Sequence, residues 1–362
     1  QAIHAPVQAP KEFVEHYLEV YAKGWDEMRK NRFEKAKKMG LIPESAQLSD
    51  NIPKAKKWNE LSEKEQKEYA TGMAITAGML EAMDFHIGRY IEYLTKNGMM
   101  ENTVFIVTSD NGPDGGDFSV AIPWAKKQGY HRDFENKGGK DYYGFMGTGF
   151  ANAVSSPFSF FKYYTGEGGL RVPFIINGSG IPNNTSNEFS FFTDIAPTIY
   201  DIVGISTSAN EGFAPITGKS LYAHINDTSI PVYKENEGVG IEAAASSAYF
   251  MKGYKIVKNN IPDGDNQWHL YHIETDPGEV VDLAEKMPEL LKKMLAAYAE
   301  YEKEVGVLKM PEGYSAQGFV AKNATKSMVK EFLPFLLIIV GLVIALVIFL
   351  VWRKRNRKKG VE

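Results

Sequence analysis

The sequence of 362 residues contains no cysteine. This absence excludes disulfides, thiolate metal sites and a cysteine nucleophile within these residues. A strongly basic surface is also lacking, because 41 Lys and Arg stand against 45 Asp and Glu. Without the last ten residues, 353–362, the counts are 35 and 44, a net charge of −9. An acidic body does not neutralise nucleic-acid phosphates, so nucleic acid is not an expected partner.

The beginning of the chain lacks the features of a natural start. QAIHAPVQAP has no initiator Met and has neither the charged nor the apolar part of a signal peptide. We therefore expect Gln1 to be a fragment boundary.

One long uncharged run is present, near the carboxyl terminus. Phe332 and Trp352 bound 21 residues without a charge, and about 20 apolar residues in a helix span a bilayer core of about 30 Å. The basic tail, residues 353–362, follows at once. The length, the terminal position and the basic flank favour a membrane span over a buried core helix or an uncleaved signal. The positive-inside bias then predicts a cytoplasmic tail and a periplasmic or extracellular body.

The first 230 residues have the alternating pattern of an α/β fold. Ser62 and Glu65 have capping-box spacing, and a helical apolar periodicity follows them to about residue 96. Residues 104–107 and 172–176 are apolar runs typical of strands buried on both faces, and 195–203 resembles a capped helix. We predict a mainly parallel sheet in which these two strands are interior neighbours. Residues 11–60, with their short basic helical pieces, are expected at the surface.

The pattern changes after Pro231 to short strands, expected at 248–250, 254–257 and 268–273. Pro288 then opens an amphipathic helix. This order predicts a small antiparallel sheet covered by a helix.

Asp110 and Asn111 follow the first apolar strand directly, in the segment TSDNG. Open α/β sheets bind ligands beyond the carboxyl ends of their strands. Carboxylate and amide oxygens suit Ca²⁺ or Mg²⁺, although an Asx turn leaving a strand has the same residues. Ca²⁺ takes about 6 to 8 oxygens, so two ligands need others.

Two further residues are candidates for chemistry. His4 lies in a short apolar segment that ends in prolines, and a histidine there can be an acid/base group or simply a partly buried side chain. Lys162 is a single cation among aromatic residues, where it can contact an anionic substrate or lie at the surface.

Several blocks occur together in a fixed order: HAPVQAP, EAMDFHIGRYIEYL with NTVFIVTSDNG, SSPFSFFKYYTGEGGLRVPFII, FTDIAPTIYDIVGI, GKSL and WHLYHIETDPGEVVDLAEKMPEL. This order resembles the second half of the sulfatase family, arylsulfatase type, from about Gln1 to Val307. The resemblance implies an alkaline-phosphatase-like α/β fold whose amino-terminal strands lie outside this sequence.

The resemblance also implies roles for single residues. Asp110 and Asn111 correspond to two ligands of one Ca²⁺ ion, His4 to the histidine that contacts sulfate and can protonate the leaving oxygen, and Lys162 to the sulfate-binding lysine. The family nucleophile is a formylglycine made in a Cys/Ser-x-Pro-x-Arg motif, which is absent here. We expect that motif, the remaining calcium ligands and the rest of the amino-terminal half upstream of Gln1.

The predicted domains are 1–230, the carboxy-terminal part of a sulfatase catalytic domain; 231–307, the small subdomain; 308–331, a linker; 332–352, the membrane helix; and 353–362, the tail. The complete protein is expected to hydrolyse a sulfate ester, either an aryl sulfate or a sulfated carbohydrate, and this chain alone is expected to be inactive. Two alternatives remain open: a phosphodiesterase or phosphonate hydrolase of the same superfamily, and a non-catalytic membrane-anchored remnant.

Overall fold

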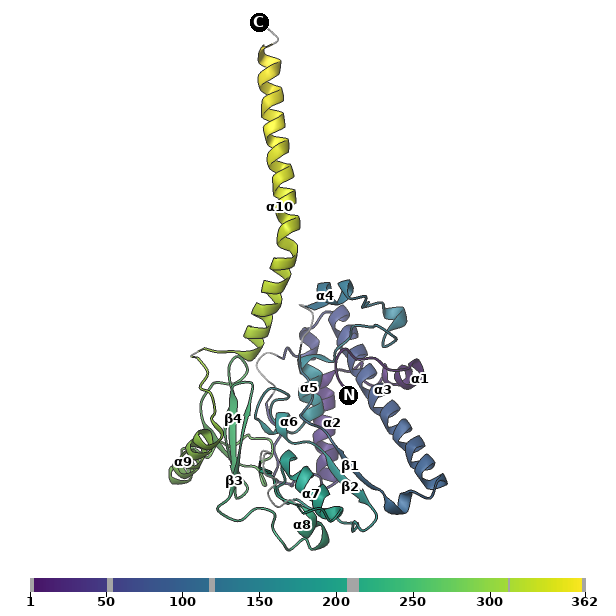
Figure 1. The fold of residues 1–362 in the computed structure, drawn as a ribbon, viewed down its shortest axis with the longest axis vertical. Coiled ribbons are helices and arrows are strands. Elements are labelled where there is room, and N and C mark those ends of the chain that lie inside the picture. Colours follow the sequence, from purple (N-terminus) through teal and green to yellow (C-terminus); the bar gives the residue numbers. More distant parts are fainter. Residues whose placement is uncertain (1–2, 51–54, 117–120, 207–214, 312, 360–362) are drawn as a thin grey trace.

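The computed structural model describes residues 3–50, 55–116, 121–206, 215–311 and 313–359 (Figure 1). Its α-helices and strands up to residue 230 are α1 (Lys11–Val14), α2 (Trp25–Lys38), α3 (Glu63–Lys96), β1 (Val104–Thr108), α4 (Ile122–Lys127), α5 (Gly147–Ser155), α6 (Glu167–Leu170), β2 (Phe174–Gly178), α7 (Ile195–Ile202) and α8 (Tyr222–Asn226). Short 3-10 helices are Glu15–Tyr17, Trp58–Glu60, Met100–Asn102, Phe134–Asn136 and Phe192–Asp194. The later elements are β3 (Gly238–Ala243), β4 (Ser246–Met251), β5 (Tyr254–Lys258), β6 (His269–His272), α9 (Pro288–Val305) and α10 (Ala316–Lys359).

The long helix α3 begins where the capping box predicts. The Ser62 hydroxyl accepts a hydrogen bond from the Glu65 backbone N–H, and the Glu65 carboxylate accepts one from the Ser62 N–H. Residues 70–78 of this helix are buried, and the chain packs so closely on them that a Cβ at Gly72 would lie 2.0 Å from the Phe145 carbonyl oxygen. Several apolar side chains of its second half are exposed, among them Leu80 and Tyr90. The helix predicted from the apolar periodicity is confirmed.

An aromatic cluster around α5 corrects the expectation that residues 11–60 lie at the surface. Trp25 is only 3% exposed, and its ring meets Phe150 edge-on with centroids 5.4 Å apart. Trp58 packs on the same Phe150 ring, and Val14 is also buried. Most basic residues of α2 face solvent, but Arg29 is 5% exposed and donates a hydrogen bond of 2.6 Å to the Ser49 carbonyl oxygen. Trp25 and Arg29 together anchor an otherwise polar helix, because the aromatic ring buries a large area. Periodicity alone does not reveal such an anchor.

Strands β1 and β2 are neighbours, as predicted, but the rest of that prediction is wrong. They pair antiparallel, with Ile106 opposite Ile176, and they form a two-stranded sheet in the described part of the chain. Neither is interior, since Val107 and Ile175 are 38% and 58% exposed. The mainly parallel sheet is therefore not what the described residues form. An apolar run specifies a strand, but the direction of its partner depends on the path of the intervening chain.

The antiparallel sheet after Pro231 is confirmed, in the order β3-β4-β5-β6. On one face Ile256 and Leu270 pack against Met294 of α9. On the other face Phe250 packs with residues of the first 230, including Leu170 of α6. The sheet is thus covered on both faces, and it joins the small subdomain to the larger one.

Helix α10 extends away from the body in Figure 1. Its segment Gly318–Trp352 contains an apolar window and is long enough to cross a membrane, judged by length and composition. The helix begins at Ala316, so most of the predicted linker 308–331 is helical rather than irregular. Its position in a membrane stays a prediction.

Candidate functional site

The loop after β1 carries the two predicted metal ligands. β1 ends at Thr108, and the Ser109 hydroxyl donates a hydrogen bond of 2.9 Å to the Asn111 carbonyl oxygen. This local bond turns the chain sharply as it leaves the strand. The Asp110 side chain is exposed, and that of Asn111 is half-buried. Both are therefore free of the core and on the same turn.

The backbone of this loop rests on helix α6. The Gly112 N–H donates a 2.9 Å hydrogen bond to the Gly169 carbonyl oxygen. A Cβ at Gly112 would lie 1.9 Å from the Gly168 carbonyl oxygen, so only glycine permits this approach. The Gly168 N–H in turn donates to the Ser159 carbonyl oxygen at 2.7 Å. Glycine on both sides thus brings two backbones together beneath Asp110 and Asn111.

His4 and Lys162, which are 158 positions apart, are in contact. The Lys162 Nζ lies 2.9 Å from the His4 Nε2. The His4 Nδ1 lies 2.8 Å from the Ala5 carbonyl oxygen, which can only accept a hydrogen bond. The Nδ1 therefore carries a proton, and in the neutral ring the Nε2 accepts from the lysine ammonium. The His4 side chain is 55% exposed and that of Lys162 is 18% exposed, so solvent reaches the pair from the histidine side.

A third residue of this cluster, Asp114, was not predicted from the sequence. Its Oδ2 lies 3.7 Å from both the His4 Nε2 and the Lys162 Nζ. Its Oδ1 accepts a hydrogen bond from the Gly116 N–H, whereas its buried Oδ2 has no hydrogen-bond partner in the described part of the chain. The carboxylate therefore places a negative charge beside the two basic groups. Its position three residues after Asn111 is the sequence feature that could have identified it as a site residue.

The two pairs of predicted residues lie on segments that contact one another. The Lys162 N–H donates a 3.1 Å hydrogen bond to the Pro113 carbonyl oxygen. The loop that begins with Asp110 therefore passes directly beside Lys162. A carboxylate, an amide, an imidazole and an ammonium group are collected around one loop, a set that suits binding of an anion next to a cation and transfer of a proton.

The family comparison gives this arrangement its context. A family model described as Sulfatase matches residues 1–205. The chain belongs to the sulfatase family. It is 32% identical over 333 residues to a sulfatase of Schizosaccharomyces pombe, covering 87% of this chain and 59% of that protein. It is 30% identical over 230 residues to an arylsulfatase of Klebsiella aerogenes, covering 61% and 49%.

The chain thus spans about half the length of these sulfatase relatives. Among solved structures, the sulfatase chain is similar to Ps i-CgsB, with 20% identity, a TM-score of 0.49, and coverage of 83% of this chain and 48% of that one. The family membership confirms the resemblance stated above, within the alkaline-phosphatase-like superfamily.

Behind the loop of this sulfatase chain lies a buried group of charges. Lys255 of β5 is fully buried, and its Nζ lies 2.9 Å from Glu167 Oε1 and 2.8 Å from Glu279 Oε1. The second Glu167 oxygen contacts the Arg171 Nε at 2.8 Å. Glu279 also accepts hydrogen bonds from the Glu167 N–H, at 2.8 Å, and from the Ser159 hydroxyl. The cluster therefore ties the small sheet to α6, which supports the loop.

The charges in this cluster shift one another's protonation. Burial by itself raises the pKa of Glu167, but the positive charges of Lys255 and Arg171 outweigh it, so the pKa of Glu167 is lowered. Burial raises the pKa of Glu279, and Lys255 offsets only part of this effect. Glu167 and Glu279 lie in two of the segments that carry the family resemblance, GEGG and DPGE. Their separation along the sequence does not predict that they are in contact.

The donors of this sulfatase chain fit part of a calcium site. Asp110 and Asn111 offer a carboxylate and an amide oxygen, the kinds of ligand that Ca²⁺ prefers. No group of three or more His, Asp or Glu able to hold a metal occurs among the residues that the structure describes. Since Ca²⁺ takes about 6 to 8 oxygens, these two residues supply a minority of the ligands.

Proposed function

We propose that this chain supplies the sulfate-contacting and proton-donating half of a sulfuric ester hydrolase. The observation that carries the proposal is the contact of His4 with Lys162 at 2.9 Å, with Asp114 3.7 Å from each. Two basic groups held together at an accessible loop form a site for an anion, because the Lys162 ammonium, and the His4 Nε2 once it is protonated, can donate to its oxygens. The sulfatase family match and the arylsulfatase relative support a sulfate ester as that anion.

Each side chain has a distinct role in the proposed reaction. The Lys162 ammonium binds an oxygen of the sulfate group and stabilises negative charge that develops there. His4, once protonated, points its Nε2–H at the leaving oxygen and donates that proton as the bond to sulfur breaks. A protonated His4 beside Lys162 places two positive charges together, and the Asp114 carboxylate reduces their repulsion.

Asp110 and Asn111 are proposed to hold Ca²⁺ together with ligands from elsewhere in the complete enzyme. When bound, the ion supplies positive charge for the oxygens around the transferred sulfur. The nucleophile is proposed to be the formylglycine of a Cys/Ser-x-Pro-x-Arg motif, which none of the 362 residues provides. A phosphonate or phosphate ester would meet the same groups, so the ester preference needs a direct comparison.

Binding can be tested without turnover. The ring resonances of His4 are followed by NMR in the full chain while 4-nitrophenyl sulfate, glucosamine 6-sulfate or 4-nitrophenyl phosphate is added. We expect saturable shifts with the sulfates, and a dissociation constant at least about tenfold higher in Lys162→Met, because a charged hydrogen bond contributes about 1.5–3 kcal/mol. Lys11→Met, whose side chain is 80% exposed, is the matched control. Unchanged binding in Lys162→Met would contradict the proposal, and stronger phosphate binding would favour the phosphohydrolase alternative.

We also propose that α10 anchors the chain in a membrane as a single span, with residues 353–362 in the cytoplasm and the body on the periplasmic or extracellular side. The support is the uncharged run from Phe332 to Trp352, inside the candidate span Gly318–Trp352, together with the basic tail. Protease added to the outer face of intact cells should release the body and protect an epitope fused to the tail. Digestion of the tail instead of the body would reverse the orientation.

A further inference from the structure

Helix α4 presents an exposed tryptophan on a well-anchored support. Ala125 in its middle is 1% exposed and packs against Tyr143 and Phe145. Trp124, its neighbour in sequence, is 51% exposed. Lys126 and Lys127 follow in the last turn, and both are exposed. A helix fixed on one side thus carries a large aromatic ring and two cations on the other.

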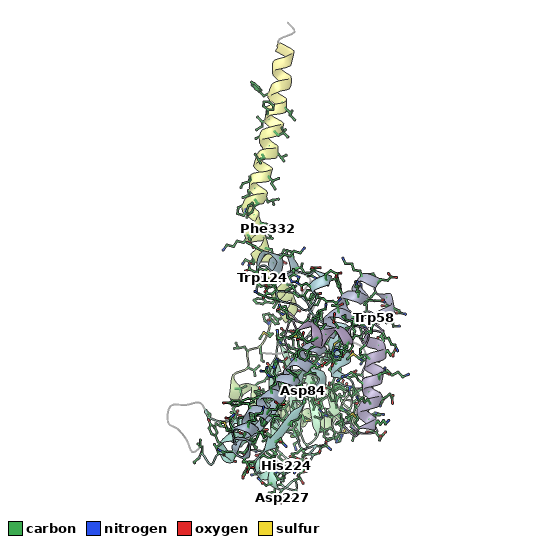
Figure 2. The ribbon with its side chains drawn as sticks, turned by 90° about the vertical axis from the view of Figure 1, so that its right-hand side faces the viewer. Trp58, Asp84, Trp124, His224, Asp227 and Phe332 are labelled. Carbon is green, nitrogen blue, oxygen red and sulfur yellow. The ribbon has the colours of Figure 1, made fainter. Side chains whose placement is uncertain are left out.

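This exposed side lies beside the start of the proposed membrane span. Figure 2 shows Trp124 next to Phe332, which is the first residue of the uncharged run. An ion pair between Lys127 of α4 and Glu331 of α10 agrees with this view. Helix α4 therefore lies beside the point at which α10 changes from polar to apolar residues.

The chemistry of both segments suits the headgroup layer of a bilayer. Tryptophan is enriched at membrane interfaces, where its ring lies among headgroups and its N–H finds polar partners. The polar part of α10 adds three exposed lysines, Lys322, Lys326 and Lys330. Together with the two lysines of α4 they make five positive charges, whereas Glu331 is the one acidic residue in the sequence of these two segments, and it pairs with Lys127. Positive charge next to an aromatic side chain matches phosphate headgroups above an acyl layer.

We propose that α4 is a second membrane contact, which lies in the headgroup layer of the bilayer that α10 crosses. The inference rests on the proposed anchor, because α10 defines where the bilayer begins. Two contacts restrict tilting of the body about the end of α10. The loop that carries Asp110, Asn111 and Asp114 is bonded to the same body through the Gly112 N–H and the Gly169 carbonyl oxygen, so restricted tilting also fixes the orientation of the candidate site to the membrane surface.

Because the sequence has no cysteine, single cysteines can report position without further changes. Three variants of the full chain are labelled with a fluorophore in nanodiscs of phosphatidylcholine and phosphatidylglycerol: Gln128→Cys at the end of α4, Leu342→Cys within the span, and Asp227→Cys at the opposite end of the body. Lipids with a nitroxide on the headgroup or deep in the acyl chain serve as quenchers. We expect headgroup quenching at Gln128→Cys, deep quenching at Leu342→Cys and neither at Asp227→Cys.

The outcomes separate this inference from the anchor. Deep quenching at Leu342→Cys with no headgroup quenching at Gln128→Cys would overturn the second contact and keep the anchor. Absence of deep quenching at Leu342→Cys would overturn both. Protection of the Gln128→Cys label from aqueous iodide without lipid quenching would indicate a protein partner on α4 instead. Adding Trp124→Ala to Gln128→Cys should reduce headgroup quenching at least twofold, whereas Tyr222→Ala, at the far end of the body near Asp227, should leave it unchanged.

Discussion

At the scale of single residues, Lys255 makes the most deeply buried ionic contacts described above. Two carboxylates, Glu167 and Glu279, face it within 2.9 Å, and Arg171 supplies a second positive charge. The cluster therefore leaves little uncompensated charge in the interior. Breaking such a group by removing one partner is costly, because the remaining charges stay buried without compensation.

Lys255→Met should therefore destabilise the chain by about 3–5 kcal/mol, as removal of one partner of a buried ion pair does. The measurement is urea unfolding of the full chain in detergent, followed by tryptophan fluorescence. Lys252→Met is the control, because this lysine lies in the turn between β4 and β5 and pairs with the exposed Glu235. Its effect should stay within about 1 kcal/mol. Equal stability of the two variants would contradict a structural role of the buried cluster.

His269 gives the small sheet a dependence on pH. Burial by itself lowers the pKa of His269, but Asp282, 2.8 Å from Nδ1, and Asp265, 3.0 Å from Nε2, raise it above its ordinary value. A raised folded-state pKa means that the stabilisation is complete below the unfolded value of about 6.5, and is lost as pH rises through the folded value.

Stability measured by urea unfolding should accordingly fall between about pH 5.5 and pH 8.5 more steeply in the wild type than in His269→Gln. Asp282→Asn keeps the oxygen that accepts from the Leu270 and Ala284 N–H groups but removes the charge, so it should flatten the same interval. Parallel pH profiles for the wild type and both variants would rule out His269 as the source of the pH dependence of stability.

Most side-chain contacts of this kind could not be predicted from the sequence. His4, Lys162, Asp110 and Asn111 were candidates from their sequence context, the family resemblance assigned their roles, and those roles stay predictions. Asp114 and Lys255 were missed, because a carboxylate or a lysine in a loop or strand looks the same whether its partner is solvent or another charge. Lys255 lies 88 positions from Glu167, and no local pattern predicts a pair at that separation.

At the scale of elements, the contact between the β1 loop and α6 decides where Asp110 and Asn111 lie. Gly112→Ala would place a methyl group 1.9 Å from the Gly168 carbonyl oxygen, so one backbone must move. We expect a loss of about 1–3 kcal/mol, typical of overpacking, and faster hydrogen exchange in residues 108–114.

Gly88→Ala on the exposed part of α3 is the matched control, because a Cβ there meets nothing within 4 Å. A helical alanine should stabilise the chain by about 0.5–1 kcal/mol relative to glycine. Hydrogen exchange by mass spectrometry distinguishes the two variants. If Gly112→Ala left exchange in residues 108–114 unchanged, the close approach would not be what holds the loop.

Elements with strong local signals were predicted well, and those that depend on distant partners were not. α3 was predicted because its cap and its periodicity are both local. α9 was predicted from Pro288 and one apolar face. β3 was missed, since its sequence begins Gly-Val-Gly and glycine is depleted in strands. The prediction that β1 and β2 belong to a mainly parallel sheet was wrong, because they pair antiparallel and a strand does not encode the direction of its neighbour.

At the scale of the whole molecule, the chain joins three parts. The α/β body belongs to the sulfatase family, the small antiparallel sheet packs on it through Leu170 and the Lys255 cluster, and α10 extends outward. The chain also spans about half the length of its curated relatives. Activity is therefore expected to depend on a nucleophile and calcium ligands that these 362 residues do not supply.

The chain of 362 residues alone should hydrolyse no aryl sulfate. It lacks the Cys/Ser-x-Pro-x-Arg motif that provides the nucleophile, and the two calcium ligands recognisable in it are too few to hold the ion. Co-expression with an amino-terminal sulfatase segment that carries the motif should restore turnover of 4-nitrophenyl sulfate. That turnover should fall by about 10²–10⁴-fold in His4→Ala, since a general acid contributes this much, and it should also be lost in Lys162→Met and Asp110→Ala. Lys11→Met should retain it. Turnover by the chain alone that survives Asp110→Ala would sink both the site assignment and the count of missing groups.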